Sequence, residues 1–361
     1  MLASFSYSFP YLDDGPRPLP LAPPVAPALF EPASAQRSVE LGLEQMQRAD
    51  GLGFDWVSLS EHHYSPRQLT ANPIVFAAAV SRVVQRARLA ILGPTVPLLN
   101  PVRIAEEFAM LDVLSGGRAI MALLRGTAPE YTTYGANPAE SRARYEEGVE
   151  LILTALAEPQ PFGWEGQFYQ FRSIAIWPRP VQARPALYLS GNSPESGSLA
   201  AGHHLGIGLS LNPLPTVRRL VAHYLAECDR LGWRPRAEDV VYRGAIFVAD
   251  SDAEARAAVE RYHIGAPGGG APANRAVREA IAATGKAGPT TSLLARPEER
   301  YVGGPTFCGA PATVLEQIQA FSEAGVGVVD LLFGTGRAPQ ALTDQSIDLF
   351  AHEVLPHLRA L

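Results

Sequence analysis

The 361-residue sequence contains only two cysteines, Cys228 and Cys308, which excludes a disulfide scaffold and a cysteine-based zinc site. We expect both to be ordinary thiols in a reducing compartment. No segment reaches the ~18 uninterrupted apolar residues of a membrane-spanning helix, and the first residues lack the basic region and long apolar run of a secretory signal. The sequence therefore predicts a cytoplasmic protein without a membrane partner.

Positive charge is also in short supply. The chain has 30 Lys and Arg residues against 36 Asp and Glu residues, which gives a formal net charge of −6. A general nucleic-acid-binding surface needs a basic stripe, so we expect no nucleic-acid partner. Hydrophobic residues make up 47% of the chain and charged residues 18%, the profile of a globular protein with a large core.

The sequence does contain a regular alternation of β-prone and helical segments. Two of the helices are each opened by an Asn cap followed by proline, at Asn72-Pro73 and Asn100-Pro101. Alternation over this length predicts a parallel sheet, and eight units is the number that closes a (β/α)8 TIM barrel of the α/β class. The β-prone segments are residues 4–8, 54–60, 88–98, 119–124, 186–190, 205–211, 240–248 and 326–333.

An open doubly wound sheet is the alternative architecture. Such a sheet calls for a glycine-rich phosphate fingerprint after its first strand. A proline-rich stretch stands in that position instead, so the barrel is favoured. We treat residues 1–361 as a single barrel domain.

Three long insertions interrupt the alternation, near residues 13–36, 159–185 and 264–309. The first is rich in proline, which predicts an extended loop. The second contains four aromatic residues between Trp164 and Phe171, a pattern more typical of a packed β-hairpin than of a ligand box. Long insertions on a barrel usually cover its active face. We expect a lid at 264–309, with a surface excursion as the alternative.

Functional residues of a barrel lie where its strands end, and the segment Gly191–Ser196 follows such an end. Ser193 as N-cap and Pro194 as first helical residue would leave backbone amides pointing at an anion, and Ser196 adds a hydroxyl. Arg125, from the end of another strand, would add a positive charge. The pattern predicts a phosphate site, with an ordinary capped helix as the alternative.

The segment Glu61-His62-His63 suggests a metal site at first sight. Zinc sites built on one segment space their histidines differently, and adjacent residues of a strand point to opposite sides. We therefore predict no metal. One inward histidine acting as a hydrogen-bond donor or acid–base group is the functional interpretation, and a structural histidine held by Glu61 is the alternative. Glu130 and Tyr131 either orient a ligand or belong to the loop surface.

Four ordered segments of the chain resemble the bacterial luciferase-like flavin-dependent monooxygenases. The resemblance runs from about Phe54 to Leu211 and resumes weakly at 311–333 and near the C-terminus. It implies a (β/α)8 barrel that binds reduced FMN at its C-terminal face and oxygenates a small organic substrate. A separate flavin reductase would supply the FMNH2. The segments are FDWVSLSEHHY, NPVRIAEEFAMLDVLSGGRA, LLRGTAPEYTTYG and LYLSGNSPESGSLAAGHHLG.

The resemblance also implies residue roles. His62 matches the histidine that supports the oxygenated flavin, Glu130 is a second catalytic candidate, and Thr95 lies in the strand end beneath the flavin ring. That strand end often carries a cis peptide, and here it departs from the luciferase version by containing Gly93-Pro94. The residues that match the phosphate-binding set are Arg125, Asn192, Ser193 and Ser196.

Two alternatives to the monooxygenase remain open. Related barrels transfer hydride with a deazaflavin, and some members of the family bind flavin without catalysis. Leu124 stands where the light-emitting subunit of luciferase has a cysteine, so we do not predict light emission. The resemblance further implies a homodimer packed through the helices at 73–85 and 101–114. The sequence does not identify the substrate.

Overall fold

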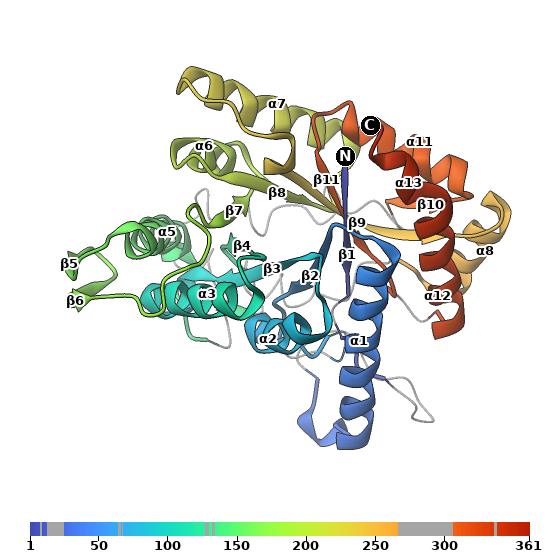
Figure 1. The fold of residues 1–361 in the computed structure, drawn as a ribbon, viewed down its shortest axis with the longest axis horizontal. Helices are drawn as coiled ribbons and strands as arrows, with labels where there is room; N and C mark the ends of the chain where they lie inside the picture. Colours follow the sequence, from blue (N-terminus) through green and yellow to red (C-terminus); the bar gives the residue numbers. More distant parts are fainter. Residues whose placement is uncertain are drawn as a thin grey trace.

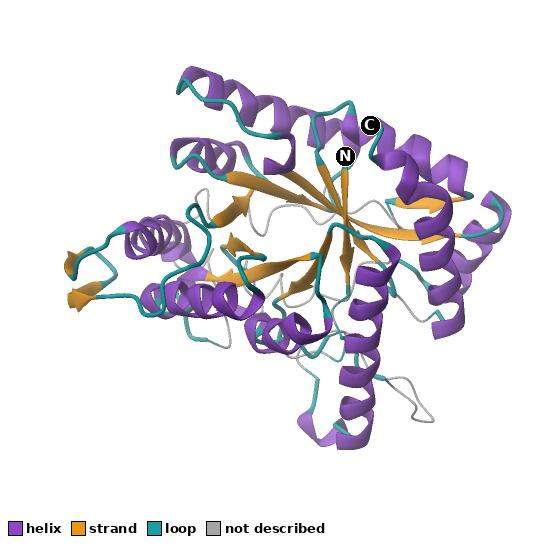
Figure 2. Ribbon diagram, in the orientation of Figure 1, coloured by secondary structure: helices purple, strands orange, loops and turns teal. Residues whose placement is uncertain are grey.

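The computed structural model describes residues 1–7, 9–12, 25–63, 66, 68–126, 130–131, 134–265, 306–335 and 338–361. Eight parallel strands close into a barrel, because each strand pairs with the next and β11 pairs back to β1. Helices surround the barrel (Figures 1 and 2). The expected TIM-barrel fold is confirmed. Its strands are β1 (Leu2–Ser6), β2 (Trp56–Ser60), β3 (Arg88–Thr95), β4 (Ala119–Leu124), β7 (Ala186–Ser190), β8 (Gly206–Ser210), β9 (Val240–Val248) and β11 (Val328–Leu332).

The helices begin where their caps predict. The Asn72 and Asn100 side chains accept hydrogen bonds from the amides of Ile74 and Val102, and a proline occupies the first turn of each helix. Within the described residues, no helix combines the length and apolar character needed to cross a membrane. The helices are α1 (Pro32–Leu52), α2 (Pro73–Val83), α3 (Pro101–Ser115), α5 (Ser141–Ala157), α6 (Pro194–Gly202), α7 (Leu214–Arg230), α8 (Asp252–Tyr262), α11 (Pro311–Ser322), α12 (Gln340–Leu349) and α13 (Leu355–Leu358), with a π-helical segment η6 (Phe350–Val354).

The barrel interior changes character along its axis. Near the amino ends of the strands it is apolar, and Trp56 packs edge-on against Tyr188 with 6.0 Å between ring centroids. Farther along the strands, Asp330 and Arg243 replace the apolar side chains that usually fill a barrel of this kind. Polar groups are therefore concentrated toward the carboxyl ends, where the sequence predicts the site.

The first insertion is shorter than predicted. Helix α1 already begins at Pro32, so residues 32–36 are helical rather than part of a loop. Proline is accepted in the first turn of a helix, because the amide that it lacks has no partner there. The start of α1 extends beyond the rest of the barrel (Figure 1). Residues 13–24 lie outside the described residues.

The second insertion contains the expected hairpin, formed by β5 (Phe162–Glu165) and β6 (Gln170–Ile174). The Glu147 carboxylate of α5 accepts hydrogen bonds from the amides of Phe168 and Tyr169 and from the indole of Trp164. The hairpin therefore packs on α5 rather than over the strand ends. Most of the expected lid, residues 266–305, lies outside the described residues, and the chain returns as β10 (Phe307–Gly309) beside β9.

Candidate active site

Glu61 joins the carboxyl ends of β2 and β3. One oxygen of its buried carboxylate accepts the Thr95 amide at 3.2 Å, and the other lies 3.3 Å from His63 Nε2. Only glycine fits at position 93, since a Cβ there would lie 2.9 Å from the Glu61 Cβ. The adjoining Gly93–Pro94 peptide bond is cis, within the stretch where the resemblance implies such a bond. The Glu61 carboxylate thus holds Thr95 beside the histidine pair.

The two adjacent histidines have different partners. His63 is buried against Glu61, and its ring meets Tyr134 edge-on at 5.2 Å. The side chain of His62 is 53% exposed, and its Nδ1 lies 3.6 Å from Oε1 of the buried Glu130. At this separation the Glu130 carboxylate lies close to the imidazole of His62 without a direct hydrogen bond between the two side chains. His63 is therefore a buried histidine held by Glu61, whereas His62 is the exposed member of the pair.

Tyr134 lies close to the charged side chains of this region. Its pKa is raised, first because the phenol is partly buried and then because the carboxylates of Glu61 and Glu130 lie near it. Two carboxylates and two histidines therefore gather at the ends of β2 and β4. Among the residues that the structure describes, no group of three or more His, Cys, Asp or Glu side chains is arranged to hold a metal ion.

Arg125 follows β4 directly and is only 9% exposed. Its carbonyl oxygen accepts a hydrogen bond from the buried Tyr131 hydroxyl. The next residue, Gly126, has a φ of +92°, and a Cβ there would lie 2.4 Å from Thr95 Cγ2. The Arg-Gly sequence thus lets the chain turn tightly against β3 while Tyr131 fixes the arginine backbone. Tyr131 therefore acts on Arg125, a role that the sequence did not indicate.

The start of α6 is built as the sequence predicts. Ser193 is the N-cap, and its hydroxyl oxygen accepts the Ser196 amide at 3.3 Å and lies 3.1 Å from Ser196 Oγ. The Asn192 side chain is bonded to the end of β8. Its Oδ1 accepts hydrogen bonds from the Ser210 amide and from Nδ2 of Asn212. Asn212 was missed by the sequence analysis. Its only signal is its position just after the strand at 205–211.

Glu195 shows that an anion is stabilised at this helix start. Its own backbone amide and the Ser193 hydroxyl hold the pKa of its carboxyl below the ordinary range, and Arg142 and Arg125 add to the effect. The first amides of α6 already bond the Glu195 carboxylate, the Ser193 hydroxyl and the Ser193 carbonyl, so the serine hydroxyls and the buried guanidinium are the donors left for a phosphate. These residues therefore fit the phosphate of a flavin mononucleotide.

The predicted site residues fall into two groups at the same end of the barrel. His62, Thr95 and Glu130 lie at the ends of β2, β3 and β4, whereas the Asn192–Ser196 segment follows β7. Strand β4 lies between β3 and β7 in the sheet, so Arg125 at its end joins the two groups.

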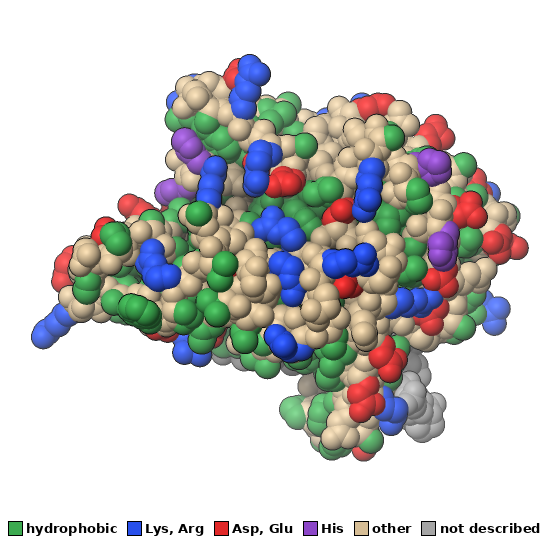
Figure 3. Space-filling model, in the orientation of Figure 1, with side chains coloured by type: hydrophobic (Ala, Val, Ile, Leu, Met, Phe, Trp, Pro, Cys, Tyr) green, Lys and Arg blue, Asp and Glu red, His purple; other side chains and the backbone are tan. Residues whose placement is uncertain are grey.

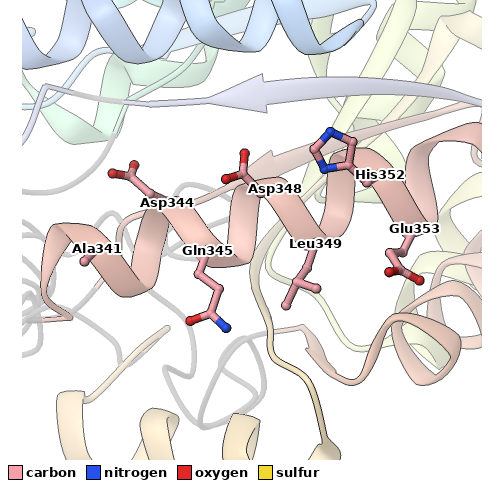
Figure 4. Close-up of a pocket in the computed structure, with 7 residues that line it drawn as sticks. All are labelled: Ala341, Asp344, Gln345, Asp348, Leu349, His352 and Glu353. Atoms are coloured by element: carbon pink, nitrogen blue, oxygen red, sulfur yellow. The ribbon is translucent and has the colours of Figure 1, made fainter.

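A separate surface pocket of about 480 Å³ runs along α12 and η6 on the outside of the barrel (Figure 4). Its lining includes Asp344 and Asp348, which both pair with Arg48 of α1. None of the predicted site residues lines it. The pocket therefore has no part in the candidate active site.

The chain is similar to several known proteins. A monooxygenase structure from Streptomyces bottropensis superposes with a TM-score of 0.76 at 26% identity, covering 99% of both chains. The oxygenase component of the flavin-dependent trigonelline monooxygenase of Acinetobacter baylyi is 25% identical over 230 residues, 62% of each chain. An F420-dependent glucose-6-phosphate dehydrogenase of Kineococcus radiotolerans is 33% identical over 158 residues, 41% of this chain and 45% of that one.

The matches to curated relatives are partial. The chain spans 53% of the length of the first such relative, a protein of Sinorhizobium fredii, and 62% of the trigonelline enzyme. The sequence model of the luciferase-like monooxygenases, in contrast, matches residues 27–327 and so includes every predicted site residue. The chain belongs to the luciferase-like monooxygenase family.

Proposed function

We propose that this protein is an FMN-dependent monooxygenase. It takes reduced FMN from a separate flavin reductase and uses O2 to insert one oxygen atom into a small organic substrate. The observation that carries the proposal is one barrel end that combines a buried arginine and a capped helix start with the His62–Glu130 pair. The naming of the trigonelline relative as an oxygenase component supports the separate reductase.

Different residues would bind the flavin and handle protons. Bound FMN would supply the electrons that activate oxygen. Arg125, Ser193 and Ser196 would hold its phosphate at the start of α6. Thr95 would lie beside the ring, and His62 would hold or move a proton at its imidazole while Glu130 orients that ring.

Hydride transfer with a deazaflavin is the second candidate, and the similarity to the F420-dependent dehydrogenase favours it. Both cofactors contain a phosphate group, so Arg125 and the start of α6 suit either cofactor. A flavin-binding protein without catalysis is the third candidate. The presence of His62 beside Glu130 weighs against this last one, since simple storage needs no acid–base group.

The test is an anaerobic titration with reduced FMN and, separately, with reduced F420. We expect FMN to bind, and Arg125→Met to weaken binding at least tenfold. Arg103→Met is the matched control, because Arg103 is an exposed arginine of α3 that pairs only with Glu106 and Glu107 in the described structure. Thermal unfolding checks that both variants fold. Binding of F420 in preference to FMN would overturn the proposal, as would equal affinities of the two variants.

We also propose that the protein is cytoplasmic, in a compartment that keeps Cys228 and Cys308 reduced. We further propose that it forms a homodimer through α2 and α3. Hydrophobic side chains reach the surface over α3 at the lower left of Figure 3. Val75 of α2 is 65% exposed and Val113 of α3 is 46% exposed, which is unusual for large apolar residues on helices of a monomer. Ala77, in contrast, is fully buried against the barrel, so α2 would meet a partner through Val75.

A further inference from the structure

The barrel interior holds a charged cluster that the proposed chemistry does not use. We define the interior cluster as Asp330, Arg243 and the three serines that contact them, Ser4, Ser58 and Ser60. Asp330 Oδ1 accepts the hydroxyls of Ser4 and Ser58 at 2.6 Å each, and Oδ2 accepts Nη1 of Arg243 at 3.0 Å. The carboxylate is therefore fully satisfied by fixed donors from three strands, β1, β2 and β9.

The interior cluster uses only part of the hydrogen-bonding capacity of Arg243. Within the part of the chain that the structure describes, its guanidinium bonds Asp330 and, at a long 3.4 Å, the Ser60 hydroxyl. A guanidinium carries five N–H groups, so most of its donor capacity remains. Its side chain is 14% exposed, whereas that of Asp330 is 2% exposed. Arginine is thus the accessible member of the pair.

The accessible side of Arg243 faces the candidate site. The opposite end of the barrel is closed by the apolar layer that contains Trp56 and Tyr188. Arg243 is in register with Ser210, whose amide donates to the Asn192 side chain. Its Nη2 lies 3.4 Å from the hydroxyl of Ser60, which precedes Glu61. The guanidinium therefore lies between the histidine pair and the phosphate-binding segment, at the floor of the barrel mouth.

Stability does not account for this cluster. Barrel interiors are normally filled by branched apolar residues, and a buried ion pair is often no more stabilising than an apolar replacement. A cation oriented by a buried carboxylate is, in contrast, a common means of binding an oxyanion with fixed geometry. The guanidinium reaches Ser60, the last residue of β2, and is in register with Ser210, the last residue of β8, and this position points to a ligand.

We propose that Arg243 determines substrate specificity by binding an oxyanion of the organic substrate, a carboxylate or a phenolate. Asp330 and the serines position the guanidinium, and FMN would occupy the space between Arg243 and the start of α6. This inference rests on the proposed function only in that the bound acid is the molecule to be oxygenated. The binding of an acid at Arg243 can be measured without any reaction.

The test compares benzoate with its uncharged analogue benzamide as probes, by ligand-observed NMR on the full chain with and without oxidised FMN. Wild type should bind benzoate at least tenfold more tightly than benzamide. The double variant Arg243→Met/Asp330→Asn removes both charges and so avoids a lone buried carboxylate; it should lose the preference. Asp330→Asn alone keeps the cation and should retain the preference. Circular dichroism confirms that each variant is folded.

Three results would overturn the proposal. Wild type could show no preference for benzoate, or the double variant could keep the preference. The third is a double variant that binds FMN at least tenfold more weakly, which would assign the cation to the flavin ring. A protein that binds benzoate through Arg243 but never binds FMN would instead leave this inference standing and contradict the proposed function.

Discussion

Single residues at the carboxyl end of the barrel set the charge of the candidate site. Arg125 brings a buried positive charge to the start of α6, and Glu195 brings an exposed negative charge to the same helix start. A phosphate that binds there must share the arginine with the Glu195 carboxylate. The site therefore contains its own competitor for the phosphate.

Replacement of Glu195 by glutamine should tighten the binding of reduced FMN by about three- to tenfold, or about 1 kcal/mol. The change removes the competing charge while keeping the size of the side chain. Isothermal titration under anaerobic conditions measures the effect, with Glu106→Gln on the exposed face of α3 as control. Unchanged or weaker binding in the Glu195 variant would show that its carboxylate does not share the phosphate position.

Gly126 tests the backbone turn that supports Arg125. Gly126→Ala should lower the free energy of unfolding by about 1–3 kcal/mol, because φ is +92° and a Cβ would meet Thr95. Gly51→Ala in α1 is the matched control: nothing lies within 4 Å of its Cβ position, so alanine should be neutral or slightly stabilising. Urea denaturation of both variants measures the difference. Equal stability of the two would contradict the proposed turn constraint.

At the scale of elements, Asp50 ties the end of α1 to the connection between α2 and β3. Its carboxylate accepts the amides of Gln85 at 2.9 Å, Arg86 at 3.1 Å and Ala87 at 2.7 Å. Burial by itself would raise the pKa of Asp50, but the three amides and the Arg86 charge lower it overall. The folded state therefore favours the ionised carboxylate.

This lowered pKa has a definite sign for stability. A depressed carboxyl pKa stabilises the fold above the ordinary value of 3.8, and the contribution is lost as pH falls through the folded value. Asp50→Asn should be less stable than wild type by about 2 kcal/mol at pH 7, and the gap should close as pH falls below 3.8. Denaturation at several pH values measures the gap, with exposed Asp229→Asn as control. A gap independent of pH would contradict this account.

The elements show why part of the structure could be predicted and part could not. Strand and helix positions follow from local patterns, such as the Asn-Pro caps of α2 and α3. Contacts between residues distant in sequence have no local pattern. The contacts of Asp50 with the Ala87 amide and of Arg243 with Asp330 are therefore visible only in the fold, although Arg243 and Asp330 each interrupt an otherwise apolar strand. The boundary at Pro32 was missed because proline favours both loops and first helical turns.

At the scale of the whole molecule, the barrel brings residues from the ends of five strands, β2, β3, β4, β7 and β8, to one face. The capped start of α6 and the position of the histidine pair were predictable as parts, because each carries a short motif. Their connection through Thr95, Gly126 and Arg125 was not, since it depends on the register of β3 and β4. The outer surface of α2 and α3 adds the proposed contact with a second copy.

Val113→Glu should convert the proposed dimer to a monomer, because it places a charge within an apolar contact. Analytical ultracentrifugation at micromolar concentration measures the mass. Leu225→Glu is the control, since Leu225 is also exposed, at 39%, but lies on α7. A monomeric wild type, or a Val113 variant that keeps the dimer mass, would rule out this interface.

The reaction of the reduced-FMN complex with oxygen tests the central claim most directly. Stopped-flow absorbance should show a transient species distinct from both reduced and oxidised FMN, and His62→Ala should shorten its lifetime at least tenfold. The control variant His352→Ala, on the outer surface at η6, should leave it unchanged. Oxidation of the bound flavin in one step, at the rate of free FMN, in wild type and both variants would contradict the monooxygenase account.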